Sequence, residues 1–369
     1  MMVITKNGTM DWPELKYSRN QVNKAGEILR DGIKGGMEEG SLRAWVEARK
    51  VLSNWRSCHG YPINTFQSTL RDKLDKLGLR KAIVAQRLKR TPSIISKLRR
   101  FESMRLARMQ DIGGLRTVVS NMGQVQLLRD SYQKSLEGIM FKHDMVAERD
   151  YIENPKDSGY RSVHLVFRYR NDRAPSYNGL LLELQIRTWI QHTWATAVET
   201  MGTFLKYALK SSEGPEEWLR FFAVAGSVFA HMEKCAPVPG YESFSWRKTI
   251  ELTVKAAEAL GVRDKLQAYS VAANAISKDT RKGRYHLIVL DPIKKEVSIR
   301  SYSRDRLDEA SEDYTKEEEK ITKGEPIDAV LVAAGDIKEL KRAYPNYFLD
   351  TRGFVRLLDK MREWSQRKG

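Results

Sequence analysis

The sequence predicts an α+β fold, in which helices flank a mixed β-sheet and a smaller α/β domain follows at the C-terminus. Helical and strand periodicities alternate through the first two thirds of the chain. Two prolines and a glycine interrupt this pattern at residues 236–243, and a strand hairpin follows near residue 290. Because 369 residues exceed what one core usually organises, we predict two domains, residues 1–260 and 261–369.

The first domain begins with helical patterns over residues 14–53 and 64–78, followed by a strand pattern over residues 82–88. A helix is expected next, with Thr91 at its N-cap and Pro92 in its first turn. The buried stripe of this helix would consist of Ile94, Ile95, Leu98 and Phe101. The remaining expected elements are strands at residues 115–120, 162–170 and 180–188, and a helix at 218–232.

The second part of the chain starts with two expected helices, at residues 246–260 and 264–277, which Gly261 separates. A hairpin of residues 284–291 and 296–303 follows. The acidic stretch SEDYTKEEEK is predicted to be a solvated helix or loop. The last expected elements are a strand at residues 329–333 and helices around 336–343 and 353–366.

The charge balance points to a polyanionic partner. The chain has 64 Lys and Arg against 47 Asp and Glu, which gives a net charge of +17. About +14 of it falls on the first 250 residues, including eight basic residues and no acidic residue from Arg80 to Arg100. No apolar run is long enough to span a bilayer and no signal peptide is evident, so we expect a cytoplasmic protein. The only cysteines, Cys58 and Cys235, exclude a disulfide framework and a cysteine-based zinc finger.

The first candidate cluster lies at a strand end and in the first turns of the next helix, and consists of Arg87, Lys89, Arg90, Ser93 and Lys97. Cations beside the free N–H groups of a helix start form a cradle for a triphosphate. A solvated basic surface would give the same run of residues.

The second cluster is the segment DIGGLRT at residues 111–117. Asp111, at the entry of a buried strand, could hold Mg²⁺ through its carboxylate, and two glycines would let phosphate oxygens approach. Arg116 is expected on the opposite strand face from its neighbours. A turn with an exposed aspartate is the alternative interpretation.

The third and fourth clusters lie on a loop and on two strands. Lys156 and an exposed Tyr160 at a loop tip would form a base-stacking platform beside a phosphate contact. His164 is expected to face away from the apolar side of its strand, where a hydrogen-bonded structural role is the alternative. The strand of residues 180–188 places Glu183, Gln185 and Arg187 on one face, which is costly unless these groups are used or the strand is an exposed edge.

Together, the segments DIGGLR, KDSGYRSVH and ELQIRT resemble the synthetase domain of the RelA/SpoT family, over roughly residues 40–235. The resemblance implies a nucleotidyltransferase-like fold and the transfer of pyrophosphate from ATP to a ribose 3′-hydroxyl. It implies that Asp111 and Glu183 are catalytic and hold Mg²⁺, with Glu183 also the base for the hydroxyl. The ATP-binding residues would be Arg87, Lys89, Ser93, Lys97 and Arg116. The acceptor would be bound by Lys156, Tyr160, His164, Gln185 and Arg187, with Tyr160 stacked on its base.

Two departures from the family pattern leave guanine recognition unsupported: Ser158 replaces a usual asparagine, and residues 194–200 lack the usual Glu-His ending. Toxic members of the family modify the 3′-terminal adenosine of tRNA, which blocks translation. A broad basic surface suits tRNA because binding releases counterions. We therefore expect a tRNA acceptor, contacted by Arg80, Lys81, Arg90, Arg99 and Arg100.

The C-terminal part contains Tyr344-Pro-Asn-Tyr347 and so resembles the CapRel proteins, which fuse a toxic synthetase to an antitoxin domain with a YxxY motif. The resemblance implies that Tyr344 and Tyr347 cover the ATP site. It also implies release by a phage protein, typically the major capsid protein, as antiphage defence. Core packing of two aromatic residues is the alternative. Two other functions stay open, a synthetase of ppGpp, pppGpp or adenosine alarmones and a non-catalytic RNA-binding regulator.

Overall fold

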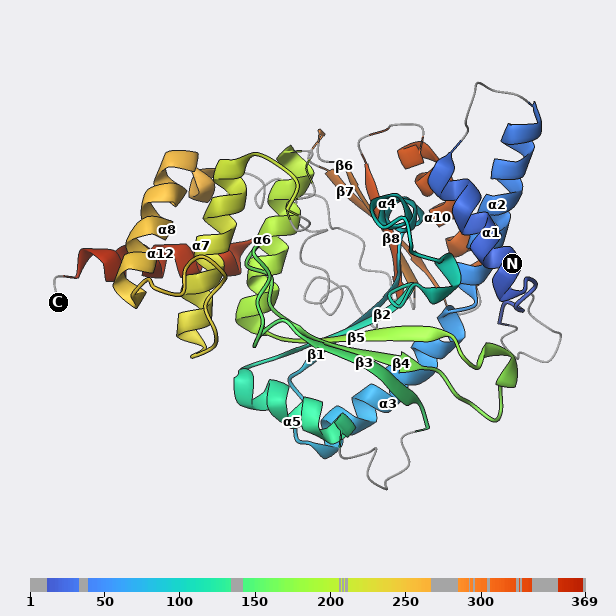
Figure 1. Ribbon diagram of the computed structural model, residues 1–369, viewed down its shortest axis with the longest axis horizontal. Helices are drawn as coiled ribbons and strands as arrows, with labels where there is room; N and C mark the ends of the chain where they lie inside the picture. Colours follow the sequence, from blue (N-terminus) through green and yellow to red (C-terminus); the bar gives the residue numbers. More distant parts are fainter. Residues whose placement is uncertain are drawn as a thin grey trace.

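The centre of the protein is a five-stranded mixed sheet with the strand order β1-β2-β5-β4-β3 (Figure 1). Its strands are β1 (Ile83–Leu88), β2 (Gly113–Val119), β3 (Asp144–Asp150), β4 (Val163–Arg168) and β5 (Leu181–Thr188). β2 and β5 run parallel, and the other neighbouring pairs are antiparallel. The computed structural model describes residues 12–32, 39–133, 142–205, 207, 209, 212–266, 285–291, 293–294, 296–303, 306–322, 325, 327–333 and 351–367.

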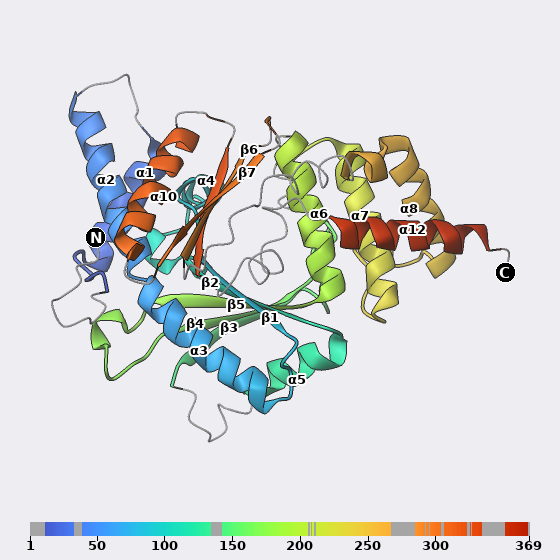
Figure 2. The same ribbon diagram turned by 180° about the vertical axis from the view of Figure 1, so that it is seen from behind.

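Helices pack on the sheet, and a further group of helices lies beyond one end of it (Figures 1 and 2). α3 (Gly60–Lys76) and α5 (Met122–Gln133) pack on the sheet, and α1 (Arg19–Asp31) packs on α2 (Glu39–Ser57) and α4 (Thr91–Arg100). α6 (Trp189–Leu205), α7 (Glu216–Met232) and α8 (Trp246–Leu260) form a helical group beyond the end of β5. The predicted α+β class with a mixed, helix-flanked sheet is thus confirmed. In the described part of the chain, no helix combines the length and apolarity needed to cross a membrane.

Apolar and polar side chains alternate along β5, and its apolar side chains lie in the core beneath the sheet. Leu182, Leu184 and Ile186 are fully buried in the apolar core, together with Leu115 of β2 and Leu165 of β4. The alternating residues Glu183, Gln185 and Arg187 are polar and lie on the opposite face of β5. Because side chains alternate across a strand, burial of one face fixes the register of the other.

One strand was missed, and two element boundaries differ from the prediction. β3 has the polar sequence DMVAERD, which gives little strand signal, and as the outer strand it pairs only with β4. The helical pattern expected over residues 14–53 corresponds to two helices, α1 and α2, and the second extends to Ser57. The helix α4 has Arg90 at its N-cap instead of Thr91. Phe101 is 47% exposed, contrary to the expected buried stripe, because α4 ends at Arg100 and Phe101 has extended backbone angles.

A second, three-stranded sheet has the order β7-β6-β8 and is entirely antiparallel. Its elements are β6 (Tyr285–Asp291), β7 (Glu296–Tyr302), α10 (Leu307–Thr322) and β8 (Asp328–Ala333). We call these four elements the C-terminal sheet unit. The predicted hairpin is confirmed as β6 and β7. The acidic stretch is helical, as one of the two predictions had it, but it is not simply solvated, because Glu317 and Glu318 are each 4% exposed.

The last helix, α12 (Arg352–Gln366), packs against α6 and α8 instead of joining the C-terminal sheet unit (Figure 1). Its fully buried Phe354 contacts the rings of Phe221, Phe222 and Phe229 on α7. The end of the chain therefore completes the core of the helical group. The domain boundary expected after residue 260 stays a prediction.

We predict that Phe354→Ala lowers the free energy of unfolding by about 3–5 kcal/mol, because it leaves a cavity among three aromatic rings. Urea denaturation of the full chain measures the change. Glu363→Ala, at an exposed position on the same helix, should change the free energy of unfolding by less than about 0.5 kcal/mol. Equal effects of the two substitutions would contradict the packing role of α12.

Candidate active site

Asp111 lies between two lysines at the end of β1 and on α4. The Lys89 Nζ is 2.9 Å from Asp111 Oδ2, and the Lys97 Nζ is 3.0 Å from Oδ1. The backbone N–H of Lys89 also donates to the carbonyl of Ile112 at 2.8 Å, which ties the end of β1 to the entry of β2. The structure thus joins the first and second predicted clusters through ion pairs.

Burial and pairing compete in setting the charge of this group. Burial opposes ionisation of Asp111, but the adjacent Lys89 and Lys97 cations outweigh it and lower the pKa of the carboxyl. Burial also disfavours the Lys89 cation and lowers its pKa, although Asp111 partly offsets this effect. Asp111 is therefore a carboxylate at neutral pH, held by cations that an incoming phosphate could also engage.

Of the two glycines that follow Asp111 and Ile112, Gly113 has a packing role that the sequence did not predict. A Cβ on Gly113 would lie 2.7 Å from Leu182 Cδ2 and 3.0 Å from Ile63 Cγ1, so any side chain would push β2 away from β5 and α3. A Cβ on Gly114 would make only an ordinary contact, 3.7 Å from the carbonyl oxygen of Arg87. Close packing of β2 thus explains Gly113 without a ligand.

The polar face of β5 supplies the second carboxylate. Glu183 accepts hydrogen bonds from His164 Nδ1 at 2.9 Å and from Gln185 Nε2 at 2.8 Å. Burial opposes ionisation, but the electrostatic and hydrogen-bond contributions of His164 and the bond from Gln185 lower the pKa of Glu183 to about 2. The carboxylate is ionised at neutral pH, which is the form that binds a cation or accepts a proton.

Asp111 and Glu183 lie close enough to interact electrostatically, and Lys97 acts on both of them. The parallel pairing of β2 with β5 causes this proximity, since Gly114 lies opposite Glu183 and Arg116 opposite Gln185. Two carboxylates are a donor set that Mg²⁺ uses when substrate phosphates supply further oxygens. Among the described residues, no group of three or more His, Cys, Asp and Glu side chains forms a fuller metal site.

Tyr160 is buried, and the prediction of an exposed stacking platform was wrong. Its side chain is 4% exposed, and its hydroxyl lies 2.8 Å from His164 Nε2. The reason lies in the preceding residue, Gly159, whose φ is +90° and which packs directly against α7. A Cβ there would lie 2.8 Å from the carbonyl oxygen of Phe222, so the loop can approach α7 only with glycine at this position.

A chain of side chains therefore runs from Tyr160 through His164 to Glu183. Lys156, on the loop before β4, lies next to this chain of side chains. Its Nζ is 4.5 Å from the ring centre of Tyr151 and 5.6 Å from that of Tyr160. Burial lowers the pKa of Lys156, while Glu183 partly offsets this effect. Tyr151, which is only partly buried, was not predicted, because it follows the strand β3 that the sequence pattern did not reveal.

Arg187 is the most deeply buried cation of the site. It is 1% exposed, and its Nε and Nη1 atoms have no hydrogen-bond partner among the described residues. Burial, together with the nearby Arg116 cation, lowers the pKa of Arg187 to about 9. A buried guanidinium with unpaired N–H groups is costly, and an anionic ligand would compensate it.

A buried ion pair fixes the end of β5, and pattern reasoning did not find it. Arg161 Nη1 lies 2.8 Å from Glu233 Oε2 at the end of α7, with both side chains almost fully buried. Glu233 also accepts hydrogen bonds from Thr188, the last residue of β5, and from Gln191, near the start of α6. Arg161 lies within the KDSGYR segment, and this segment could have indicated that Arg161 belongs to the site. No sequence pattern indicated that Glu233 is its partner.

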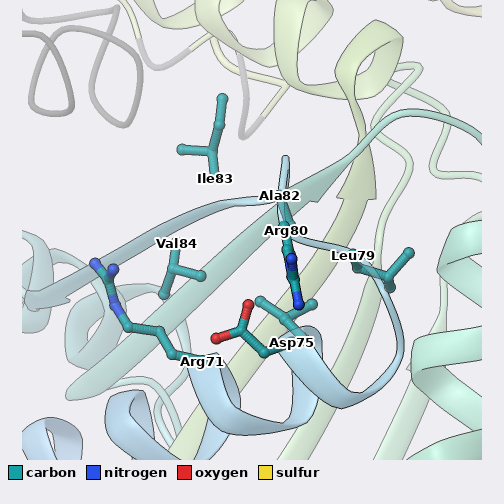
Figure 3. Close-up of a pocket in the computed structure, with 8 residues that line it drawn as sticks. Arg71, Asp75, Leu79, Arg80, Ala82, Ile83 and Val84 are labelled. Carbon is teal, nitrogen blue, oxygen red and sulfur yellow. The ribbon is translucent and has the colours of Figure 1, made fainter.

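The five basic residues expected to contact tRNA do not form one patch. Arg80 lies before β1, where it lines a cavity of about 180 Å³ with Arg71 and Asp75 (Figure 3). Lys81 is its exposed neighbour, and β1 separates both from Arg90, Arg99 and Arg100 at and on α4. Arg99 donates to the carbonyl of Arg30, and Arg100 pairs with Glu213.

The other residues singled out in the sequence lie at the following positions. Ser93 lies in the first turn of α4, and Arg87 and Arg116 lie on the neighbouring strands β1 and β2. Ser158 is buried, and its hydroxyl has no hydrogen-bond partner within the described ranges. Tyr344 and Tyr347 lie outside the described residues, so their predicted contact with the ATP site stays a prediction.

Comparison with known proteins agrees with this geometry. Residues 86–207 match the family model described as the region found in RelA / SpoT proteins. This segment of the chain is similar to the RelA/SpoT region. It spans β1 to α6 and includes both carboxylates, the lysines of α4 and β1, and the buried chain from Tyr160 to Glu183.

Similar proteins include GTP pyrophosphokinase YjbM of Bacillus subtilis, which is 36% identical to this chain over 123 residues. That match covers 32% of this chain and 55%, or about half, of YjbM. The uncharacterized protein Rv1366 of Mycobacterium tuberculosis is 26% identical over 226 residues, which cover 60% of this chain and 70% of Rv1366. The structure of a GTP pyrophosphokinase family protein from Streptococcus pneumoniae has a TM-score of 0.40 and 26% identity, over 51% of this chain and 90% of that one.

We predict that Glu183 contributes to stability in a pH-dependent way. Because its folded pKa of about 2 lies below the usual 4.5, the contribution is complete above about pH 4.5 and is lost as the pH falls toward 2. The free energy of unfolding of the parent chain should therefore fall relative to Glu183→Gln by up to about 3 kcal/mol over this range. Urea unfolding at several pH values measures the difference, and a constant difference would contradict the lowered pKa.

Proposed function

We propose that the chain is an ATP-dependent pyrophosphokinase that transfers pyrophosphate to the 3′-hydroxyl of the 3′-terminal adenosine of tRNA and so blocks translation. The observation that carries the proposal is the arrangement of Asp111 and Glu183, two ionised carboxylates beside Lys89 and Lys97. Phosphoryl-type transfer needs cations around the developing charge and carboxylates that can hold a metal. The RelA/SpoT region, which contains these groups, supports this reaction class.

In this proposal, five residues bind the phosphates and adenine of ATP: Arg87, Lys89, Ser93, Lys97 and Arg116. The carboxylates of Asp111 and Glu183 hold Mg²⁺. The metal would neutralise phosphate charge. The lysines would exchange Asp111 for phosphate oxygens, which keeps the charges compensated in both states. Two nitrogens of Arg187 have no partner among the described residues, and their N–H groups would bind an anionic substrate. His164 would hold Glu183 in place while Tyr160 holds the imidazole, and Lys156 would bind on the acceptor side.

The acceptor assignment rests on charge. About +14 of the net charge lies on the part of the chain that contains the site, more than a nucleotide pocket needs, and a polyanion rewards such a surface. A free guanosine nucleotide is the second candidate, favoured by the 36% identity to a protein named GTP pyrophosphokinase. We further propose that the C-terminal part holds the enzyme closed, with Tyr344 and Tyr347 on the ATP site, until a phage protein such as a capsid protein releases it.

Incubation of the full chain with ATP labelled at the γ-phosphate, and either tRNA or GDP and GTP, should place the label in tRNA. Full-length protein is needed because α12 completes the core of the helical group. A closed form that opens 1% of the time still retains about 1% of the open rate, so a high enzyme concentration makes turnover measurable. Glu183→Gln should lower the rate by about 10²–10⁴, and Glu153→Gln, an exposed position, should not.

Label in GTP or GDP and none in tRNA would replace the first candidate with the second. No transfer to any acceptor, together with tRNA binding that Glu183→Gln leaves unchanged, would favour a non-catalytic RNA-binding regulator.

We also predict that Arg99→Gln with Arg100→Gln weakens tRNA binding and lowers the slope of log K against log salt concentration by about 1–2, because two phosphate contacts are lost. Filter binding at several salt concentrations measures the slope. Arg356→Gln with Lys360→Gln removes the same charge from exposed positions on α12 and should leave the slope unchanged. The same slope in all three proteins would argue against tRNA contact by α4.

A further inference from the structure

A glutamate of the C-terminal sheet unit is bound to the first turn of α4. The Glu318 side chain on α10 accepts hydrogen bonds from the backbone N–H of Thr91 at 3.1 Å and from the Thr91 hydroxyl at 3.2 Å. The same carboxylate pairs with Arg56 Nη1 of α2 at 3.1 Å. The contact therefore joins three helices that are far apart in the sequence, as Figure 2 shows for α2, α4 and α10.

This contact is buried, and both oxygens of the Glu318 carboxylate accept hydrogen bonds. The Tyr314 hydroxyl, one turn earlier on α10, donates to Glu318 Oε1 at 2.6 Å, and the Arg56 guanidinium lies 4.9 Å from the centre of the Tyr314 ring. The side chains of Glu318 and Arg56 are 5% and 11% exposed. Removing one partner of such a pair leaves a buried charge uncompensated, which is strongly unfavourable.

The neighbouring glutamate, Glu317, has a different set of partners. Glu317 pairs with Arg300 of β7 and with Lys320 of α10, so it stabilises the C-terminal sheet unit itself. Glu318 instead binds Arg56 and Thr91, which belong to the first part of the chain, in addition to Tyr314 of its own helix. A solvated acidic helix would need no such partners. This side of α10 is therefore an interface.

The position of the contact connects it to the site. Thr91 lies two residues after Lys89 and two before Ser93, and Lys89 pairs with Asp111. The start of α4 presents backbone N–H groups and the positive end of the helix, which favour an anion, and a carboxylate already occupies the N–H of Thr91. β8 of the same unit lies against β1, the strand that contains Arg87.

We propose that Glu318 is the latch that holds the C-terminal sheet unit against the start of α4 and so limits the access of ATP to the site. The inference rests on the proposed function, since it assigns the ATP phosphates to the lysines and serine around Thr91. It adds to that function a specific closing contact in the described part of the chain, apart from Tyr344 and Tyr347. Opening requires Arg56 and the Thr91 N–H to exchange Glu318 for water or phosphate.

The test compares binding of α,β-methylene-ATP to the full chain and three variants by calorimetry. Glu318→Gln keeps the side-chain shape but removes the charge that Arg56 needs, and Arg56→Gln breaks the same pair from the other side. Each should bind the analogue about tenfold more tightly than the parent, because the closed population falls. Glu319→Gln is the control, since it removes the same charge from an exposed position on α10.

Hydrogen exchange supplies a second measurement that needs no ligand. The peptide containing Thr91 should exchange faster in Glu318→Gln than in the parent, while amides of β5 should stay protected and show that the variant is folded. If Glu318→Gln fails this folding check, Arg56→Gln decides the result.

The outcomes separate the latch from the proposed function. Tighter binding in both latch variants, with the control equal to the parent, supports the latch. Measurable binding that is the same in all four proteins overturns the latch and leaves the proposed function intact. If neither the parent nor any variant binds the analogue, the proposed function fails, and the latch that rests on it fails with it.

Discussion

The parallel pairing of β2 with β5 is the constraint on which the site depends. It places the entry of β2, with Asp111, beside the polar face of β5, with Glu183. The partly buried Asp111 and the buried Glu183 repel each other unless other groups compensate their charge, and Lys89, Lys97 and the His164 contact provide that compensation. Gly113 allows the two strands to approach, because a side chain there would collide with Leu182.

The surroundings of these strands hold the polar groups at fixed positions. The Tyr160–His164–Glu183 chain is buried against α6 and α7, and the Arg161–Glu233 pair ties the loop before β4 to the end of α7. Such networks are costly when one member is missing, so they favour a single arrangement of the loop and strands. Arg187 is the exception, because two of its nitrogens have no partner in the described part of the chain. A site prepared for an anion would have this property.

The C-terminal part of the chain makes two different kinds of contact with the first part. α12 contributes apolar side chains to the core around α7, as an integral part of that fold. The C-terminal sheet unit instead meets α2 and α4 through a buried ion pair and hydrogen bonds. Polar contacts of this kind can be exchanged for water or another anion with less loss than an aromatic core. The two contacts thus differ in kind, since one is an apolar core and the other is a buried polar interface.

The sequence by itself determined the fold class, four of the five strands of the central sheet, the hairpin of β6 and β7, and the polar residues of the site, because all of these follow from local periodicity and recognisable segments. β3 escaped because its charged sequence lacks the alternation of a half-buried strand. Only the tertiary structure decided that Tyr160 is buried, that Lys89 and Lys97 neutralise Asp111, that Arg161 pairs with Glu233, and that Glu318 reaches Thr91 and Arg56. Each of these depends on which distant segments meet, and a charged residue has the same local pattern whether it faces water or a buried partner. Periodicity reports the face on which a side chain lies, whereas its partner, and hence its charge state and role, is set by packing between elements.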